Sequence, residues 1–158
     1  MLSSTPFKEI FKMAVQPNKA RLKKLMSITS DVPRKMNIIT VSATTKKLSA
    51  EDSGAFVILT GGSASTAILP APEAGLHFEF YAGSAEVHII QAGSNVIQGN
   101  YRHNTAATTI VRVAVEDKGK LTLHSSNRAI GDRLELWSDG TSWYVDGIVN
   151  NALTLGTV

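Results

Sequence analysis

The segment GDRLELWSDGTSWYVDGI, residues 131–148, constrains the fold more strongly than any other part of the chain. Two runs of alternating apolar and polar residues flank an Asp-Gly pair, a combination typical of a β-hairpin. A two-residue loop at Asp139 and Gly140 gives one set of strand faces, and a four-residue loop from Asp139 to Ser142 gives the same set. The segment therefore predicts two antiparallel strands with defined inner and outer faces.

The two tryptophans of this hairpin fall on opposite faces. With the two-residue loop, Leu136 lies opposite Trp143 on an apolar face, and Arg133 lies opposite Asp146 on the other face. Trp143 is therefore predicted to lie in the core. Trp137 is predicted to lie on the surface, either packed against its own chain or available as a contact for a partner.

The chain beyond Leu48 consists of short apolar runs separated by turns rich in Gly, Asn, Ser and Pro. Many short strands at such spacing are typical of a sandwich, a jelly roll or a barrel, and we predict an all-β fold with a jelly-roll or β-sandwich body. No convincing repeat of roughly 20–50 residues supports a solenoid. Besides the hairpin, strands are predicted at 56–59, 67–69, 75–81, 87–90, 96–97, 109–116, 121–123 and 153–155.

The charge of the chain is divided unevenly along its length. Residues 1–47 contain ten Lys and Arg against two acidic residues, whereas residues 48–158 contain six basic residues against eleven acidic ones. We therefore predict two parts, a basic N-terminal arm with its linker over residues 1–47 and a β-rich body over residues 48–158.

The arm contains two short amphipathic segments that are predicted to be helical. Thr5 and Pro6 are suited to begin a helix that Pro17 ends, and a second apolar stripe follows. Helices this short are marginal alone in water, so they need a surface to dock against. The candidate partner-binding residues are the apolar and basic side chains of these segments: Phe7, Ile10, Phe11, Lys12, Arg21, Leu22, Lys23, Lys24, Leu25 and Met26.

Nucleic acid, an anionic membrane and an acidic protein surface are the three kinds of partner that suit a basic arm. The body offers little of the interleaved aromatic and basic residues of a nucleic-acid platform. No run approaches the roughly 18 apolar residues that span a bilayer. An acidic protein surface is therefore the expected partner, and neither nucleic acid nor a membrane is expected.

Cysteine is absent, which rules out disulfides, thiolate metal ligands and a cysteine nucleophile. The apolar content of 43% is that of an ordinary soluble protein, and the N-terminus lacks the apolar core of a secretory signal. We therefore expect synthesis and assembly in a reducing cytoplasm.

Residues able to support catalysis or metal binding are scattered along the chain. The four histidines have no ligand spacing, and three of them fall in predicted strands opposite the core face, so we interpret them as surface residues. The stretch 61–65 lacks the glycine that follows the serine in a nucleophile elbow and is interpreted as a turn. Carboxylates occur singly or as sequence neighbours, without an acid/base pair. No enzymatic activity, metal or other cofactor is predicted.

Four segments of the predicted body resemble, in order, a pattern that recurs in β-rich virion proteins of tailed bacteriophages. Such domains occur in small head decoration (cement) proteins and in parts of tail fibres and tailspikes. The likeness covers about residues 47–150, and its motifs are structural turns rather than a catalytic signature. The segments are KLSAEDSGAFVIL (47–59), AILPAPEAGLHFEFY (67–81), VHIIQAGSNVIQG (87–99) and the hairpin (131–148).

The resemblance implies a capsid decoration protein that binds the outer head surface and stabilises contacts between major capsid proteins. It implies homotrimers at capsid three-fold positions, with the arm laid across neighbouring major capsid proteins, and a location on the virion surface. One body and one arm fit this role better than a tail fibre, which would require a shaft. The alternative is a tail-fibre, tailspike or other virion domain that binds carbohydrate, with Trp137, Tyr144 and Tyr101 as a candidate stacking platform.

Overall fold

A computed structural model of the protein describes residues 36–106, 109–123 and 130–158. Met36–Val158 form one compact unit, which we call the body. The predicted arm helices, and the ten arm residues predicted to bind a partner, lie outside the described residues.

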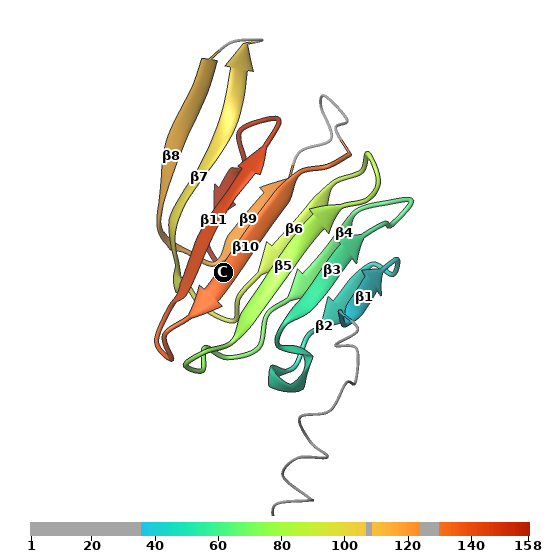
Figure 1. The fold of residues 1–158 in the computed structure, drawn as a ribbon, viewed down its shortest axis with the longest axis vertical. Coiled ribbons are helices and arrows are strands. Elements are labelled where there is room, and N and C mark those ends of the chain that lie inside the picture. Colours follow the sequence, from blue (N-terminus) through green and yellow to red (C-terminus); the bar gives the residue numbers. More distant parts are fainter. Residues whose placement is uncertain (1–35, 107–108, 124–129) are drawn as a thin grey trace, which may run out of the picture. The chain divides into compact units, whose positions relative to one another are not determined.

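The body contains two sheets, and the larger one, sheet A, has seven strands among the described residues (Figure 1). Neighbouring strands pair in both parallel and antiparallel directions. In spatial order the strands are β1 (Ile38–Val41), β3 (Ala55–Leu59), β5 (His77–Ala82), β10 (Arg133–Ser138), β11 (Trp143–Val149), β7 (Ile97–Ala106) and β8 (Thr109–Lys118).

The smaller sheet, sheet B, has five strands in the described part of the chain, and its apolar side chains join those of sheet A in a single core. This two-sheet arrangement confirms the predicted all-β fold in its coarse form, a β-sandwich. A short 3-10 helix, η1 (Ala50–Asp52), precedes β3. In spatial order the strands of sheet B are β12 (Thr154–Gly156), β9 (Lys120–Leu123), β6 (His88–Gln91), β4 (Ser65–Ile68) and β2 (Thr45–Lys47).

The first six strands alternate between the two sheets. β1, β3 and β5 lie parallel in sheet A, and β2, β4 and β6 lie parallel in sheet B. Ile38 pairs with Phe56 and Phe56 pairs with Glu79, so the chain returns to the same row of sheet A after 18 and then 23 residues. Because these spacings differ, the winding leaves no regular repeat in the sequence.

The core between the sheets has an aromatic centre. Phe78 and Phe80 of β5 are buried, as the alternation of that strand predicted. The ring of Trp143 packs against Phe78 with centroids 5.7 Å apart. Ile90 and Leu121 of sheet B are also fully buried, so both sheets contribute to one apolar layer.

The body begins before the predicted boundary at residue 48. Residues 36–47 were predicted to be part of the arm and linker, but they belong to the compact unit and contain β1 and β2. Val41 is buried, and its strand pairs with β3. These two short strands are edge strands, β1 of sheet A and β2 of sheet B, a position that local composition did not reveal.

The hairpin has the predicted faces but a different register. Its loop has four residues, because the Asp139 carboxylate accepts hydrogen bonds from the backbone N–H groups of Thr141 and Ser142, each at 2.8 Å. The pairs expected from a two-residue loop are therefore wrong by two positions: Leu136 lies opposite Val145, Trp137 opposite Tyr144, and Arg133 opposite Ile148. Both loops preserve side-chain parity, so the predicted positions of the tryptophans are confirmed. Trp143 is 0% exposed and Trp137 is 41% exposed.

The long strand β7 begins where only a two-residue strand was predicted. It pairs with β8 along its length, and the two strands extend beyond the end of β11 (Figure 1). Gly99 of β7 lies at a register shift in this pairing and has φ of +118°. A Cβ at this position would collide with the backbone carbonyl of Val145 in β11. Only glycine therefore permits the close approach of β7 to β11.

We expect Trp143→Ala to destabilise the body by about 3–5 kcal/mol, because it leaves a cavity in the aromatic centre of the core. Trp137→Ala should cost much less, since its side chain is partly exposed. Trp143→Phe should fall between them, because the Trp143 Nε1 has no hydrogen-bond partner among the described residues. Urea unfolding monitored by circular dichroism measures all three, and equal losses for the two alanine variants would contradict the observed packing.

Gly99→Ala is expected to destabilise the body by more than about 1 kcal/mol, because it combines a left-handed backbone with a collision against β11. Gly62→Ala is the matched control, since a Cβ there meets open space. Comparison of the thermal midpoints tests this directly, and a stable Gly99→Ala variant would show that β7 and β11 can separate without loss.

Candidate functional site

The outer face of sheet A, which points away from sheet B, carries aromatic and charged side chains in rows across neighbouring strands. The first row is aromatic: His77 of β5, Trp137 of β10 and Tyr144 of β11 are register neighbours. The His77 and Trp137 rings stack with centroids 5.4 Å apart and planes at 22°. Trp137 and Tyr144 are each 41% exposed. This row thus presents two aromatic side chains to solvent.

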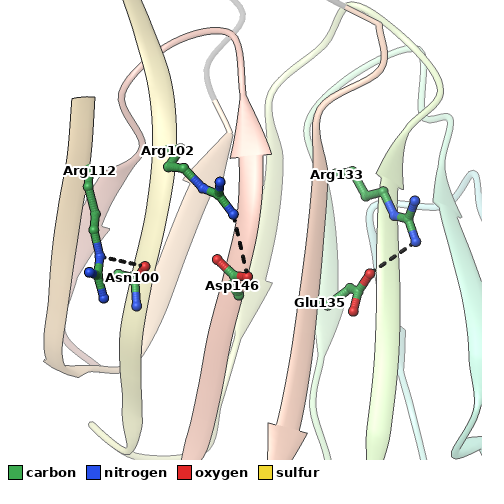
Figure 2. Close-up of polar contacts among 6 residues, drawn as sticks. All are labelled: Asn100, Arg102, Arg112, Arg133, Glu135 and Asp146. Carbon is green, nitrogen blue, oxygen red and sulfur yellow. Dashed lines mark hydrogen bonds and ion pairs between the residues drawn. The ribbon is translucent and has the colours of Figure 1, made fainter. Parts of the chain in front are cut away.

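A second row has three carboxylates, which form ion pairs with two arginines. Glu79, Glu135 and Asp146 lie side by side on β5, β10 and β11, an arrangement that like charges oppose. Arg133 contacts Glu79 at 2.7 Å and Glu135 at 3.0 Å. Arg102 of β7 lies 3.9 Å from Asp146 (Figure 2). These pairs are partly exposed, so each contributes at most about 1 kcal/mol, and their main effect is to orient the side chains.

Arg112 of β8 is a further cation on this face. It lies opposite Arg102 in the β7–β8 register. Its Nε donates a hydrogen bond of 2.9 Å to the Asn100 Oδ1, which holds the guanidinium beside β7 (Figure 2). Among the described residues no carboxylate forms an ion pair with Arg112. Two neighbouring strands therefore place two guanidinium groups on the same surface.

Trp137 and Tyr144 of the aromatic row and the two arginines border the same open hollow, of about 540 Å³. A smaller hollow of about 230 Å³ adjoins it beside Arg133 and Ile148. Arg102 and Asp146 line both hollows and so connect them. The larger hollow is lined by Gly99, Asn100, Arg102, Arg112, Trp137, Tyr144, Val145 and Asp146.

Hydrogen bonds from the hairpin loop hold Tyr144 in place. Its hydroxyl donates to the Asp139 Oδ2 at 3.0 Å. The backbone N–H groups of Ser142 and Thr141 bond the same carboxylate and lower the pKa of Asp139, so that it stays ionised. The hydrogen bond to Asp139 in turn raises the pKa of Tyr144. The phenol is therefore a neutral, positioned group at neutral pH.

The candidate stacking platform is formed by two of its three predicted aromatic residues. Trp137 and Tyr144 are neighbours on the outer face, whereas Tyr101 is buried in the core. The Tyr101 hydroxyl accepts a hydrogen bond of 3.0 Å from the backbone N–H of Leu153. Tyr101 occupies an inward position of β7, a strand that was not predicted at this point, so its inclusion in the platform was wrong.

One histidine that was interpreted as a surface residue lies in the interior. His88 is 0% exposed, and its Nδ1 is 2.7 Å from the hydroxyl of Ser65, which is equally buried. Its Nε2 lies 3.2 Å from both the hydroxyl and the carbonyl oxygen of Ser84. Burial lowers the pKa of His88, so the ring is neutral at pH 7. The Ser65–His88 pair is a polar link between β4 and β6 with no exposed surface for a substrate.

The other histidines have different surroundings. His77 lies on the outer face as predicted, and His103 is buried beside Tyr101, so its surface interpretation was wrong. His124 lies outside the described residues. Within the described ranges no three His, Asp or Glu side chains gather closely enough to hold a metal ion. No helix in that part of the chain is long and apolar enough to cross a membrane.

Comparison with known proteins finds no matching family model, no matching curated protein and no matching solved structure.

Burial of neutral His88 predicts a loss of stability at mildly acidic pH. Its folded pKa is lowered, so below about pH 6.5 the unfolded chain binds a proton that the folded chain does not. Stability is therefore lost as pH falls from 7.5 to 5.5, by at most about 1.4 kcal/mol for this group, the limit reached if the folded ring takes up no proton. His88→Gln should remove that part of the loss. Urea unfolding at both pH values measures it, and identical losses in the two proteins would exclude His88 as the source.

Proposed function

We propose that this protein is a tailed-phage capsid decoration protein, whose β-sandwich body lies on the outer head surface while its basic arm binds the major capsid protein. The observation that carries the proposal is the division of the chain into a body with a complete core and a separate basic segment. The body has one apolar core, which runs from Val41 to Leu153, and it forms a compact unit of its own. We propose that it folds without the arm, which leaves the arm for attachment.

The four segments that resemble phage virion proteins have structural roles in the body. Each contains a glycine with positive φ at a turn or close contact: Gly54, Gly75, Gly99 and Gly140. The resemblance thus rests on residues that shape the fold, which suits a rigid particle component. We propose that the protein is not an enzyme and needs no cofactor.

The charge of the arm supports an acidic partner surface. Residues 1–35 carry eight basic and two acidic residues, whereas residues 36–158 carry eight basic and eleven acidic ones. Docking would bury the two apolar stripes of the arm and allow its short helices to form. The charge attraction should weaken as salt rises, because ions screen exposed charges.

The edge of sheet A supports self-association into the proposed homotrimer. β8 is the last strand of sheet A and is ten residues long. Its Ile110 is 69% exposed. A long edge strand with an exposed apolar side chain favours pairing with another chain. The trimer would form in the host cytoplasm and then bind the virion surface.

The alternative function is carbohydrate binding by a tail-fibre or tailspike component. The observation that favours it is the exposed pair Trp137 and Tyr144 beside the larger hollow. This surface is compatible with a decoration protein as well, because it lies on the folded body and needs nothing from the arm.

Deletion of residues 1–35 tests the proposed attachment. We expect residues 36–158 to give the circular dichroism spectrum and thermal transition of a folded β protein, because the core is complete. Full-length protein should cosediment with capsids that lack it, and the truncated protein should bind at least about tenfold more weakly. Replacement of Lys23 and Lys24 by Gln in the full chain should weaken binding without affecting folding.

Light scattering on both forms gives the oligomer mass, for which we expect a trimer. Full-strength binding of capsids by residues 36–158 would overturn the role of the arm. A folded full-length protein that binds no capsid at any salt concentration would overturn the decoration function itself.

A further inference from the structure

The larger hollow combines an aromatic wall with two arginines, of which Arg102 forms a long ion pair with Asp146 and Arg112 forms none with a carboxylate of the described residues. β5 and β11 flank β10 on opposite sides, so the indole of Trp137 has His77 on one side and Tyr144 with the hollow on the other. Stacking with His77 and the hydrogen bond from Tyr144 to Asp139 hold both rings in position. A ligand that packs against them therefore needs little reordering of the site.

The cations of the hollow are positioned to bind a carboxylate. The Nε of Arg112 donates a hydrogen bond to Asn100. Among the described residues its two terminal nitrogens form no ion pair. Arg102 lies 3.9 Å from Asp146, which is too long for a hydrogen bond. Both guanidinium groups thus retain donors for an incoming anion, and a planar carboxylate matches their geometry.

We propose that this hollow binds an acidic sugar, a pyranose ring that carries a carboxylate, within a surface glycan. The apolar C–H face of the ring packs against Trp137 and Tyr144. Its carboxylate pairs with Arg112 and Arg102, and its hydroxyls bond the Asp146 carboxylate and the Asn100 amide. This inference is independent of the arm and of its attachment to a capsid.

The charges around the hollow favour this ligand over others. A neutral sugar would leave the Arg112 guanidinium without an anionic partner. A nucleic-acid strand would bring a row of phosphates, whereas Arg102 and Arg112 are the two cations that line the hollow. An acidic sugar offers both groups that the hollow can bind: a ring for the aromatic wall and a single carboxylate for the pair of arginines.

Isothermal titration of the full-length protein tests the proposal with two acidic probes and their neutral counterparts. The probes are sialyllactose against lactose, and trigalacturonate against galactotriose. At least one acidic probe should bind, and at least about tenfold more tightly than its neutral counterpart, because charge-assisted bonds to arginine are lost in the latter. The pair that shows this difference identifies the class of acidic sugar.

Substitutions on the outer face locate the binding site. Trp137→Ala and Arg112→Gln should each lower the affinity about tenfold or more. Ile38→Ala, at another exposed position of sheet A, and Lys120→Gln, in sheet B, are the matched controls and should bind as the unaltered protein does. Circular dichroism confirms folding of each variant, and Arg112→Gln changes only an exposed side chain.

Three outcomes would overturn the proposal. The first is no binding of either acidic probe, and the second is equal binding of acidic and neutral probes. The third is acidic-probe binding that Trp137→Ala and Arg112→Gln leave unchanged, which would assign it to another basic part of the chain, such as the arm.

Discussion

The contact between Trp143 and the aromatic residues of β5 is the constraint on which the rest of the structure depends. Trp143 packs against Phe78 at the centre of sheet A, where β5, β10 and β11 meet. Side chains alternate along a strand, so the burial of Trp143 directs its neighbour Tyr144 outward. The same parity places Trp137 on the outer face. The core therefore determines which side chains lie on the outer face of sheet A.

Buried polar groups within this apolar layer favour one register of strand pairing over others. His88 contacts Ser65 between β4 and β6, and Asp132 joins the start of β10 to the end of β11. The Asp132 Oδ1 accepts hydrogen bonds from the backbone N–H and the side-chain amide of Asn150, at 2.8 and 2.6 Å. Burial raises the pKa of Asp132, while these bonds oppose the rise. A shifted register would leave such groups without partners, which disfavours alternative pairings.

The core and the two proposed binding surfaces use different parts of the chain. The inner faces of both sheets are filled by the core, whereas the candidate sugar site uses outer-face side chains and the proposed capsid contact uses the arm. Arg112 and Arg102 are exposed, so changes at these positions should have little effect on the core. Such a separation suits a protein whose body must be rigid while its contacts are adapted to a particular particle or glycan.

The sequence by itself determined the all-β class, most strand positions and the faces of the terminal hairpin, because each of these depends on local alternation and turn residues. It did not determine the register of that hairpin, since two-residue and four-residue loops give the same parity. The sequence also did not predict the inward position of His88, the burial of Tyr101 or the full length of β7. In β7 glycine and histidine occupy inward positions, so no apolar alternation marks the strand.

Only the tertiary structure decided which strands are neighbours. The parallel order of β1, β3 and β5 results from a chain that crosses repeatedly between sheets at unequal intervals. The larger hollow joins side chains from β7, β8, β10 and β11, whose residues Asn100 and Tyr144 are far apart in the sequence. Local patterns set the side of a sheet on which a residue lies, whereas long-range packing sets what lies beside it.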